Sequence, residues 1–160
     1  MPAPITPELI YQLTSVSDPT MSPDGGRLAF VRSRVNREVM ETRSQVMVIS
    51  LPDGEPTSLS GATAGSLPRF SPDGASMAWL RPDDKERRQI WLAPSNGGEA
   101  RKLTHMPGGV TEYAWSPDSK ALVFVSDLDP DRLPEDHNAK VDPRVRVVRR
   151  IQYRADTIGW

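Results

Sequence analysis

The chain has 160 residues, a formal net charge of −1, 37% hydrophobic residues and no cysteine. This charge balance gives no reason to expect nucleic acid or an anionic membrane as a partner, and the lack of cysteine excludes a disulfide framework. No signal sequence opens the chain and no apolar run is long enough to span a bilayer, so we expect a soluble, cytoplasmic protein.

The first residues predict a short helix. Thr6 stands where an N-cap is expected, Pro7 follows at the first helical position and Glu8 lies in the first turn. An apolar stripe at helical spacing follows: Leu9, Ile10 and Leu13. Because so short a helix is not stable alone, we expect this stripe to lie on another surface. That surface is either the rim of the remaining fold or a second domain reached by the N-terminal arm.

A Ser-Pro-Asp turn occurs three times in the chain. The copies align without gaps as MSPDGGRLAF (21–30), FSPDGASMAWL (70–80) and WSPDSKALVFV (115–125). Ser22 and Ser71 are 49 residues apart, and Ser71 and Ser116 are 45 apart. In each turn the serine side chain can accept a hydrogen bond from the following backbone, and the proline presets φ. Each turn is therefore predicted to join two strands.

The similarity between the copies continues beyond the turn. A third strand is predicted at QVMVIS (45–50) and at QIWLAP (89–94), followed by a Gly-containing turn and a short segment that ends at Leu59-Ser60 or Leu103-Thr104. The third strands alternate in hydrophobicity, which predicts antiparallel sheets with two differently covered faces. First strands are predicted at residues 67–70 and 112–115, and more weakly at 19–21. A repeat of about 48 residues is the length of a four-stranded propeller blade.

The predicted fold class is all-β: a partial β-propeller of about three four-stranded antiparallel blades with a short N-terminal helix. We expect an N-terminal arm or helix at 1–16 and an incomplete propeller at 17–160, with blades at about 17–62, 63–108 and, in part, 109–160. Three blades do not close a ring, since propellers typically have at least about four. The end at Gly159-Trp160 is interpreted as a cut within the fold. The exposed blade edges predict self-association or partner chains.

Two charged stretches lie between the predicted second and third strands. They are Arg32–Arg43 in the first repeat and Asp83–Arg88 in the second. We expect both to be solvated hairpin loops that serve solubility rather than recognition.

The C-terminal part departs from the repeat. Residues 127–143 form an acidic insertion, so the third strand of the last blade is predicted to start at about Val145. The segment 144–154 has five arginines and no acid. As a strand it places Val145, Val147, Ile151 and Tyr153 on one face, with Arg149 as an exception, and Arg146, Arg150 and Arg154 on the other. One interpretation is a nucleic-acid-binding strand, in which the arginines contact phosphates and the tyrosine stacks on a base. We favour a blade strand whose arginines pair with the acids of the preceding loop: Asp131, Glu135 or Asp136.

No catalytic or metal-binding constellation is predicted. The segment 61–65 reads GATAG, with Thr63 where a hydrolase nucleophile would stand, but it is expected in a polar loop without a base or oxyanion hole. His105 and His137 are both predicted to be exposed loop residues. Asp127, Asp129 and Asp131 open like a calcium loop, yet Arg132 stands where that loop needs glycine and Asn138 where it needs glutamate. The prediction is no catalytic residue, no metal and no cofactor, with any substrate-binding residue unassigned.

The SPDG turns followed by LAF or MAW, and the segment QIWLAPSNGGEARKLT, resemble the N-terminal propeller of the prolyl oligopeptidase family of serine peptidases. The similarity is to the branch of acylaminoacyl peptidases and dipeptidyl peptidases, and it includes the opening ITPELIYQLTSVSDPTMSPDGGRLAFV and the segment VRVVRRIQYRADTIGW. Tol-system periplasmic propellers share the SPDG turn. The leader helix and the arginine-rich strand that ends in Tyr153-Arg154-Ala155-Asp156 favour the peptidases.

The resemblance implies a seven- or eight-bladed propeller over a C-terminal α/β-hydrolase domain that carries a Ser, Asp and His triad. The propeller would then gate the access of short peptides. No family catalytic residue matches a position of this chain, so we expect the chain alone to be no enzyme, whereas the parent protein would be a serine peptidase. Arg150 or Arg154 could hold a peptide carboxylate or carbonyl, and neither is assigned that role. The alternative is a non-enzymatic, Tol-like binding module that completes its ring by oligomerisation, two chains giving six blades.

Overall fold

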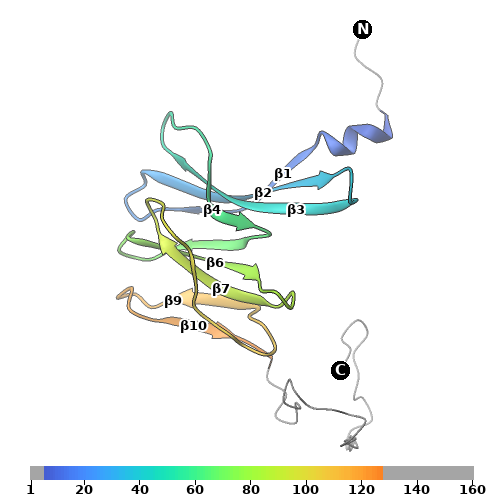
Figure 1. Ribbon diagram of the computed structural model, residues 1–160. Helices are drawn as coiled ribbons and strands as arrows, with labels where there is room; N and C mark the ends of the chain where they lie inside the picture. The colour runs from blue at the N-terminus through green and yellow to red at the C-terminus, as the bar shows by residue number, and fades with distance from the viewer. Residues whose placement is uncertain (1–5, 128–160) are drawn as a thin grey trace, which may run out of the picture. The chain divides into compact units, whose positions relative to one another are not determined.

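The computed structural model describes residues 6–127, without the side chains of residues 60–63. Antiparallel sheets follow one another along this part of the chain (Figure 1). The first sheet consists of β1 (Thr14–Met21), β2 (Arg27–Asn36), β3 (Glu41–Ser50) and β4 (Thr57–Thr63). The second consists of β5 (Ser66–Phe70), β6 (Ser76–Pro82), β7 (Arg88–Pro94) and β8 (Arg101–Lys102). The third is the hairpin of β9 (Glu112–Trp115) and β10 (Leu122–Val125). The predicted all-β class is confirmed.

Each strand pairs with its neighbour in sequence. The order is β1-β2-β3-β4 in the first sheet and β5-β6-β7-β8 in the second, and every pairing is antiparallel. Equivalent residues of the two repeats occupy equivalent places, since Phe30 lies opposite Met47 and Trp79 lies opposite Trp91. Such meanders need only short connections, as the closely spaced turn signals predicted.

The leader is the 3₁₀-helix η1 (Pro7–Tyr11), so a helix at this position is confirmed. Pro7 opens it, and Thr6 has the extended conformation of an N-cap, φ −115° and ψ 157°, without a capping side-chain hydrogen bond to the backbone. The predicted stripe is not buried, since Leu9, Ile10 and Leu13 are 39%, 51% and 59% exposed. A five-residue 3₁₀ turn has three residues per turn and does not gather these side chains on one α-helical face.

Two expected loops are strands. β2 continues to Asn36 and β3 begins at Glu41, so the loop expected at Arg32–Arg43 is wrong and the turn between these strands spans only residues 37–40. Polar cross-strand pairs extend the ladder beyond the apolar core: the Arg32 guanidinium donates to Gln45 Oε1 at 2.8 Å. The GATAG segment is likewise no simple loop, because β4 includes Gly61 to Thr63.

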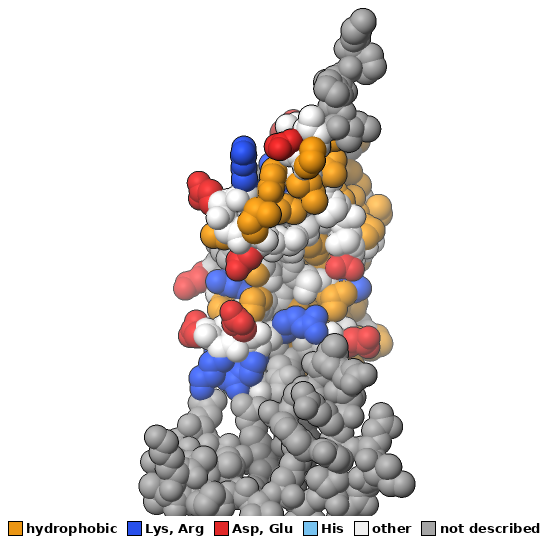
Figure 2. Space-filling model, turned by 90° about the vertical axis from the view of Figure 1, so that its right-hand side faces the viewer, with side chains coloured by type: hydrophobic (Ala, Val, Ile, Leu, Met, Phe, Trp, Pro, Cys, Tyr) orange, Lys and Arg blue, Asp and Glu red, His pale blue; other side chains and the backbone are white. Residues whose placement is uncertain are grey.

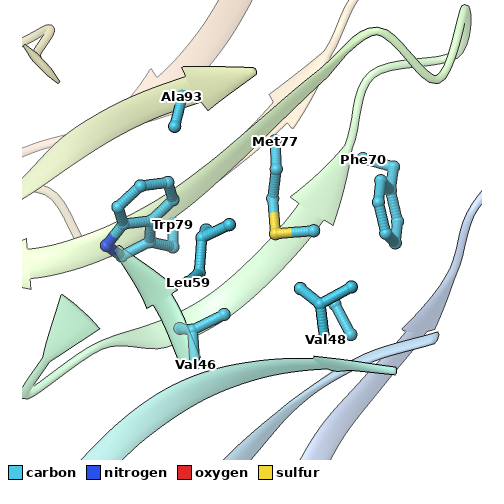
Figure 3. Close-up of a cluster of buried hydrophobic side chains, with 8 residues drawn as sticks. Val46, Val48, Leu59, Phe70, Met77, Trp79 and Ala93 are labelled. Carbon is cyan, nitrogen blue, oxygen red and sulfur yellow. The ribbon is translucent and has the colours of Figure 1, made fainter. Parts of the chain in front are cut away.

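The core covers both faces of the second sheet. Towards the first sheet, Met77 and Trp79 of β6 pack with Val46 and Val48 of β3, together with Ala29, Leu59, Phe70 and Ala93 (Figure 3). On the opposite face, Ala78, Leu80, Ile90 and Val110 form a second cluster, against which Tyr113, Trp115 and Leu122 pack. All four residues from Met77 to Leu80 have no exposed surface. Side chains alternate between the two faces of a strand, so the apolar run Met77–Leu80 of β6 is buried on both faces of the sheet.

The glutamine that opens the third strand of the second sheet is a buried polar anchor. Gln89 has no exposed surface. Its Oε1 accepts from Thr104 Oγ1 and from the Met106 N–H, both at 2.9 Å, and its Nε2 donates to the Met106 carbonyl at 2.9 Å. Thr104 Oγ1 in turn accepts from the Ile90 N–H at 2.9 Å. This network fastens the segment that leads from β8 towards β9 onto β7.

Candidate functional site

The three Ser-Pro-Asp turns share one hydrogen-bond pattern, as the sequence predicted. In the first, Ser22 Oγ accepts from the Arg27 N–H at 2.8 Å. Ser71 and Ser116 accept in the same way from the residues five positions later, each at 2.9 Å. Each serine hydroxyl also donates to the aspartate two positions on. The turns are therefore closed by side chains as well as by the strand ladder.

The aspartates of these turns are held as carboxylates. The hydrogen bond from the serine hydroxyl, followed by one from a backbone N–H, keeps the pKa of Asp24 below its ordinary value. The same two causes lower the pKa of Asp73 and of Asp118. Accepting hydrogen bonds stabilises the charged form of a carboxyl. These carboxylates complete the turns and are not available as proton carriers at neutral pH.

Neighbouring turns are joined to one another. The Arg27 guanidinium, beside the first turn, donates from Nη1 to the Ser95 carbonyl at 2.6 Å and from Nη2 to the Gly74 carbonyl of the second turn at 3.2 Å. It also lies 5.5 Å from the centroid of the Phe70 ring. Ser119 of the third turn accepts, through Oγ, from the Asp73 N–H of the second at 3.0 Å. The turns form a connected row at one end of the sheets.

The first strands of the second and third sheets are also joined, by side chains of β9. The Tyr113 hydroxyl lies 2.6 Å from the carbonyl oxygens of both Leu67 and Ala78, and Trp115 Nε1 donates to the Arg69 carbonyl at 3.2 Å. Burial raises the pKa of the Tyr113 hydroxyl, so it remains a donor. The repeat pattern of the sequence does not predict this contact. Its signal is the aromatic pair of Glu-Tyr-Ala-Trp before the third turn.

A bulge in the first strand presents one of these carbonyls. The register of β5 shifts between Ser66 and Arg69, and Leu67 there has a φ of +50°. The register of β1 shifts at the equivalent place, where Asp18 has a φ of +51°. Bulges bend a strand and re-aim its groups. In both strands a proline follows the bulged residue, and this proline is the sequence signal for the bulge. In the third repeat Tyr113 stands in place of this proline, and β9 pairs with β10 without a register shift.

The residues considered as catalytic or metal-binding do not come together within the described part of the chain. Thr63 ends β4, opposite Gln45. His105 is exposed, as predicted. Among residues 6–127 no three His, Cys, Asp or Glu side chains gather as metal ligands. Other candidates lie outside the described residues: His137, Asp129, Asp131, Arg132, Asn138, Arg150 and Arg154, as does the third strand predicted from Val145.

The Asp83–Arg88 stretch forms a tight turn. Asp83 Oδ1 accepts from the backbone N–H groups of Lys85 and Arg87 at 2.9 and 3.0 Å, and its Oδ2 lies 3.6 Å from Arg87 Nε. The expectation of a solvated loop is met at residues 84–86, which are exposed, whereas Asp83 is folded into the turn.

Within the described residues, no helix has the length and apolar character needed to cross a membrane.

Comparison with known proteins shows what these sheets are. The chain is 35% identical over 125 residues to the uncharacterized peptidase YuxL of Bacillus subtilis, covering 78% of this chain and 19% of that protein. Among solved structures, the acylaminoacyl peptidase of Pyrococcus horikoshii matches with a TM-score of 0.65 and 27% identity, over 81% of this chain and 20% of that one. The β-propeller domain of the trilobed protease of Pyrococcus furiosus matches in fold, with a TM-score of 0.59 and 22% identity over 71% of this chain and 34% of that domain. No protein-family model matches.

The sheets are therefore blades of a β-propeller. The predicted resemblance to the N-terminal propeller of prolyl oligopeptidase family peptidases is confirmed. It spans about a fifth of the length of the curated peptidases it matches. The Tol-Pal system protein TolB of Nitratidesulfovibrio vulgaris also matches, with 35% identity over 85 residues, 52% of this chain and 18% of that protein.

Proposed function

We propose that the chain forms part of a propeller that gates the access of short peptides to an α/β-hydrolase domain of a serine peptidase. In this proposal blade one spans about residues 17–62, blade two 63–108 and the described part of blade three begins at about 109, after an N-terminal arm at 1–16. The chain contributes scaffold rather than catalytic groups. The peptide bond would be cleaved in the hydrolase domain, which is the partner of this propeller.

The observation that carries the proposal is the extent of the match to peptidases. The similarity to YuxL covers 125 residues and that to the Pyrococcus horikoshii enzyme covers 81% of the chain, so both exceed any single blade. A turn motif alone would match only about ten residues of each repeat. The similarity therefore extends over successive blades. A propeller that gates access to an active site requires such successive blades, packed side by side.

The contacts between blades support a size filter in physical terms. A ring of blades excludes folded proteins only if neighbouring blades do not part. Blades one and two are joined by Arg27 and by the apolar cluster around Trp79. Blades two and three are joined by Tyr113 and Trp115, which bind carbonyl groups of β5. These links hold neighbouring blades in fixed succession.

The experiment starts from the parent gene. We expect the parent gene to continue downstream of residue 160 through further blades to an α/β-hydrolase reading frame with a G-x-S-x-G segment. The polypeptide that joins both parts should hydrolyse short acylated or dipeptidyl substrates and spare folded proteins. The matched control is the same polypeptide with Ser replaced by Ala in the G-x-S-x-G segment. A parent gene without a hydrolase frame, or a joined enzyme that cleaves folded proteins as fast as short peptides, would overturn the proposal.

The TolB match supports a second candidate function, a non-enzymatic binding module. TolB is as similar in sequence as YuxL, although over 85 rather than 125 residues. A module of this kind would have to complete its ring with a second copy. A discrete, symmetric oligomer of the purified chain, seen by light scattering, would favour this function over the peptidase gate.

A further inference from the structure

The turn between β7 and β8 contains an asparagine whose side chain is free. Asn96 is exposed, and among residues 6–127 no hydrogen bond holds its side-chain amide. Asn36, at the end of β2, differs because its Oδ1 accepts from the backbone N–H groups two and three positions later, at 2.9 and 3.4 Å. The amide of Asn96 can therefore turn towards the backbone that follows it, whereas the amide of Asn36 must first leave these hydrogen bonds.

The backbone after this asparagine is open. A Cβ built on Gly97 would have no atom within 4 Å apart from its own residue and its chain neighbours. The Gly97 N–H donates to the Pro94 carbonyl at 3.1 Å, and this bond closes the turn. In the corresponding turn of the first blade, a Cβ on Gly54 would lie 2.4 Å from the Ser50 carbonyl oxygen, so that glycine is tightly enclosed. Gly97 is the more accessible of the two, and it has no side chain to hinder a reaction at its nitrogen.

Two aspartates that also precede a glycine are held in a different way. Asp24 and Asp73 each accept from a serine hydroxyl and from the N–H two positions later. Both have a lowered pKa and are carboxylates at neutral pH, and their negative charge repels an attacking nucleophile. Of these turns, that of Asn96 combines a free, neutral amide with an open glycine nitrogen.

We propose that Asn96-Gly97 is a site of spontaneous deamidation, a reaction that contributes to the thermal lability of asparagine. The Gly97 nitrogen gives up its proton to a solvent base and forms a bond to Cγ of Asn96. The bond from Cγ to the side-chain nitrogen breaks, and this nitrogen takes up a proton from water and leaves as ammonia. Water then opens the resulting succinimide ring. Opening at Cγ gives aspartate, whereas opening at the backbone carbonyl carbon gives isoaspartate, in which the main chain runs through Cγ and is longer by a CH₂ group.

The lengthened backbone would lie beside the link between blades one and two. Ser95, the residue before the asparagine, is 5% exposed and is held by three groups. Its N–H donates to the Ala75 carbonyl at 2.9 Å, its hydroxyl donates to the Gly74 carbonyl, and its own carbonyl accepts from Arg27. An additional CH₂ group between residues 96 and 97 enlarges the hydrogen-bonded turn, so we expect the turn to loosen around Ser95.

Mass spectrometry of the complete 160-residue chain tests the proposal. After incubation in warm neutral buffer, we expect the fragment with Asn96 to gain the mass difference between NH₂ and OH, in two products of equal mass that chromatography separates. The rate should exceed that at Asn36 by at least about tenfold, since misplaced reacting groups can slow a reaction by about a hundredfold. Asn96→Gln is the matched control. It keeps an exposed amide but would have to form a larger ring, so the mass gain at this position should fall to the level of Asn36.

Hydrogen exchange tests the consequence for the fold. In the isoaspartate product the Ser95 N–H should exchange faster than in the unmodified chain. Asn96→Asp adds the charge without lengthening the backbone and should leave this rate close to that of the unmodified chain. The end of the sheets that faces the reader in Figure 2 carries η1 and lies opposite the row of turns, so it serves as the internal reference. No mass gain at Asn96, or an equal gain at Asn36, would overturn the deamidation site, and an unchanged Ser95 rate would overturn its effect on the turn.

Discussion

The two faces of the second blade are held by different means. Towards the first blade, the contact is mainly an apolar cluster centred on Met77 and Trp79, with Arg27 joining the turns at its end. Towards the third blade, the apolar cluster is smaller and two aromatic side chains, Tyr113 and Trp115, bind backbone carbonyls of β5. The first interface combines a large apolar cluster with the Arg27 hydrogen bonds at its end, whereas in the second the hydrogen-bond donors are the packed aromatic side chains themselves. The same repeat therefore supports two kinds of contact.

The largest expected effect is at the apolar interface. Trp79→Ala should lower the free energy of unfolding by about 3–5 kcal/mol, because Trp79 is fully buried and its loss leaves a cavity. Within the described residues its Nε1 has no hydrogen-bond partner, so Trp79→Phe should cost clearly less. Urea denaturation followed by circular dichroism measures both. Equal losses for the two variants would show that volume is not what Trp79 contributes.

The apolar interface could be predicted from the sequence and the directed one could not. The alternation in 45–50 and 89–94 and the repeated turns determine which residues face a core, and the structure confirms those strands. The contact of Tyr113 depends on the bulge at Leu67, whose carbonyl it reaches. Periodicity does not reveal a carbonyl re-aimed by a bulge. The hydrophobic pattern also does not give the full length of β2 and β3, which polar cross-strand contacts such as Arg32 with Gln45 extend.

The second prediction concerns the directed interface. Tyr113→Phe should lower the free energy of unfolding by about 1–3 kcal/mol, because it removes the hydroxyl that the part-buried carbonyl oxygens of Leu67 and Ala78 contact. Tyr11→Phe is the matched control, because the Tyr11 hydroxyl donates to the sulfur of the exposed residue Met40, at 3.2 Å. Thermal unfolding should distinguish the two variants. A Tyr113→Phe chain as stable as Tyr11→Phe would contradict the role given to this hydroxyl.

The third prediction concerns the row of turns. Arg27→Met keeps an unbranched apolar stem but removes both donors to Ser95 and Gly74, and should cost about 1–2 kcal/mol in the free energy of unfolding. Arg34→Met is the control, because Arg34 donates from an exposed position to Thr14 within the first blade. Hydrogen exchange should show the added opening of Arg27→Met at the second turn, around Gly74. A loss confined to the first turn would contradict a link between blades.

The smallest expected effect is a dependence on pH. The pKa values of Asp24, Asp73 and Asp118 are lower in the folded chain than their ordinary value of about 4. Their contribution to stability is therefore fully present above about pH 4 and is lost as the pH falls through the lowered values. Ser22→Ala removes the main cause of the shift at Asp24 and should make the acid limb of the stability curve shallower. A series of urea melts from neutral pH to about pH 2 measures this slope, and an unchanged slope would contradict it.

The most direct test of the peptidase-gate account is the solution mass of the purified chain by light scattering, with peptide hydrolysis assayed on the same peak. The account predicts no turnover, because it places the catalytic groups in the hydrolase domain, and no closed ring, because about three blades do not close one. A discrete symmetric oligomer without activity would contradict it in favour of a self-completing binding module. Turnover that follows the protein peak would contradict both readings of the chain.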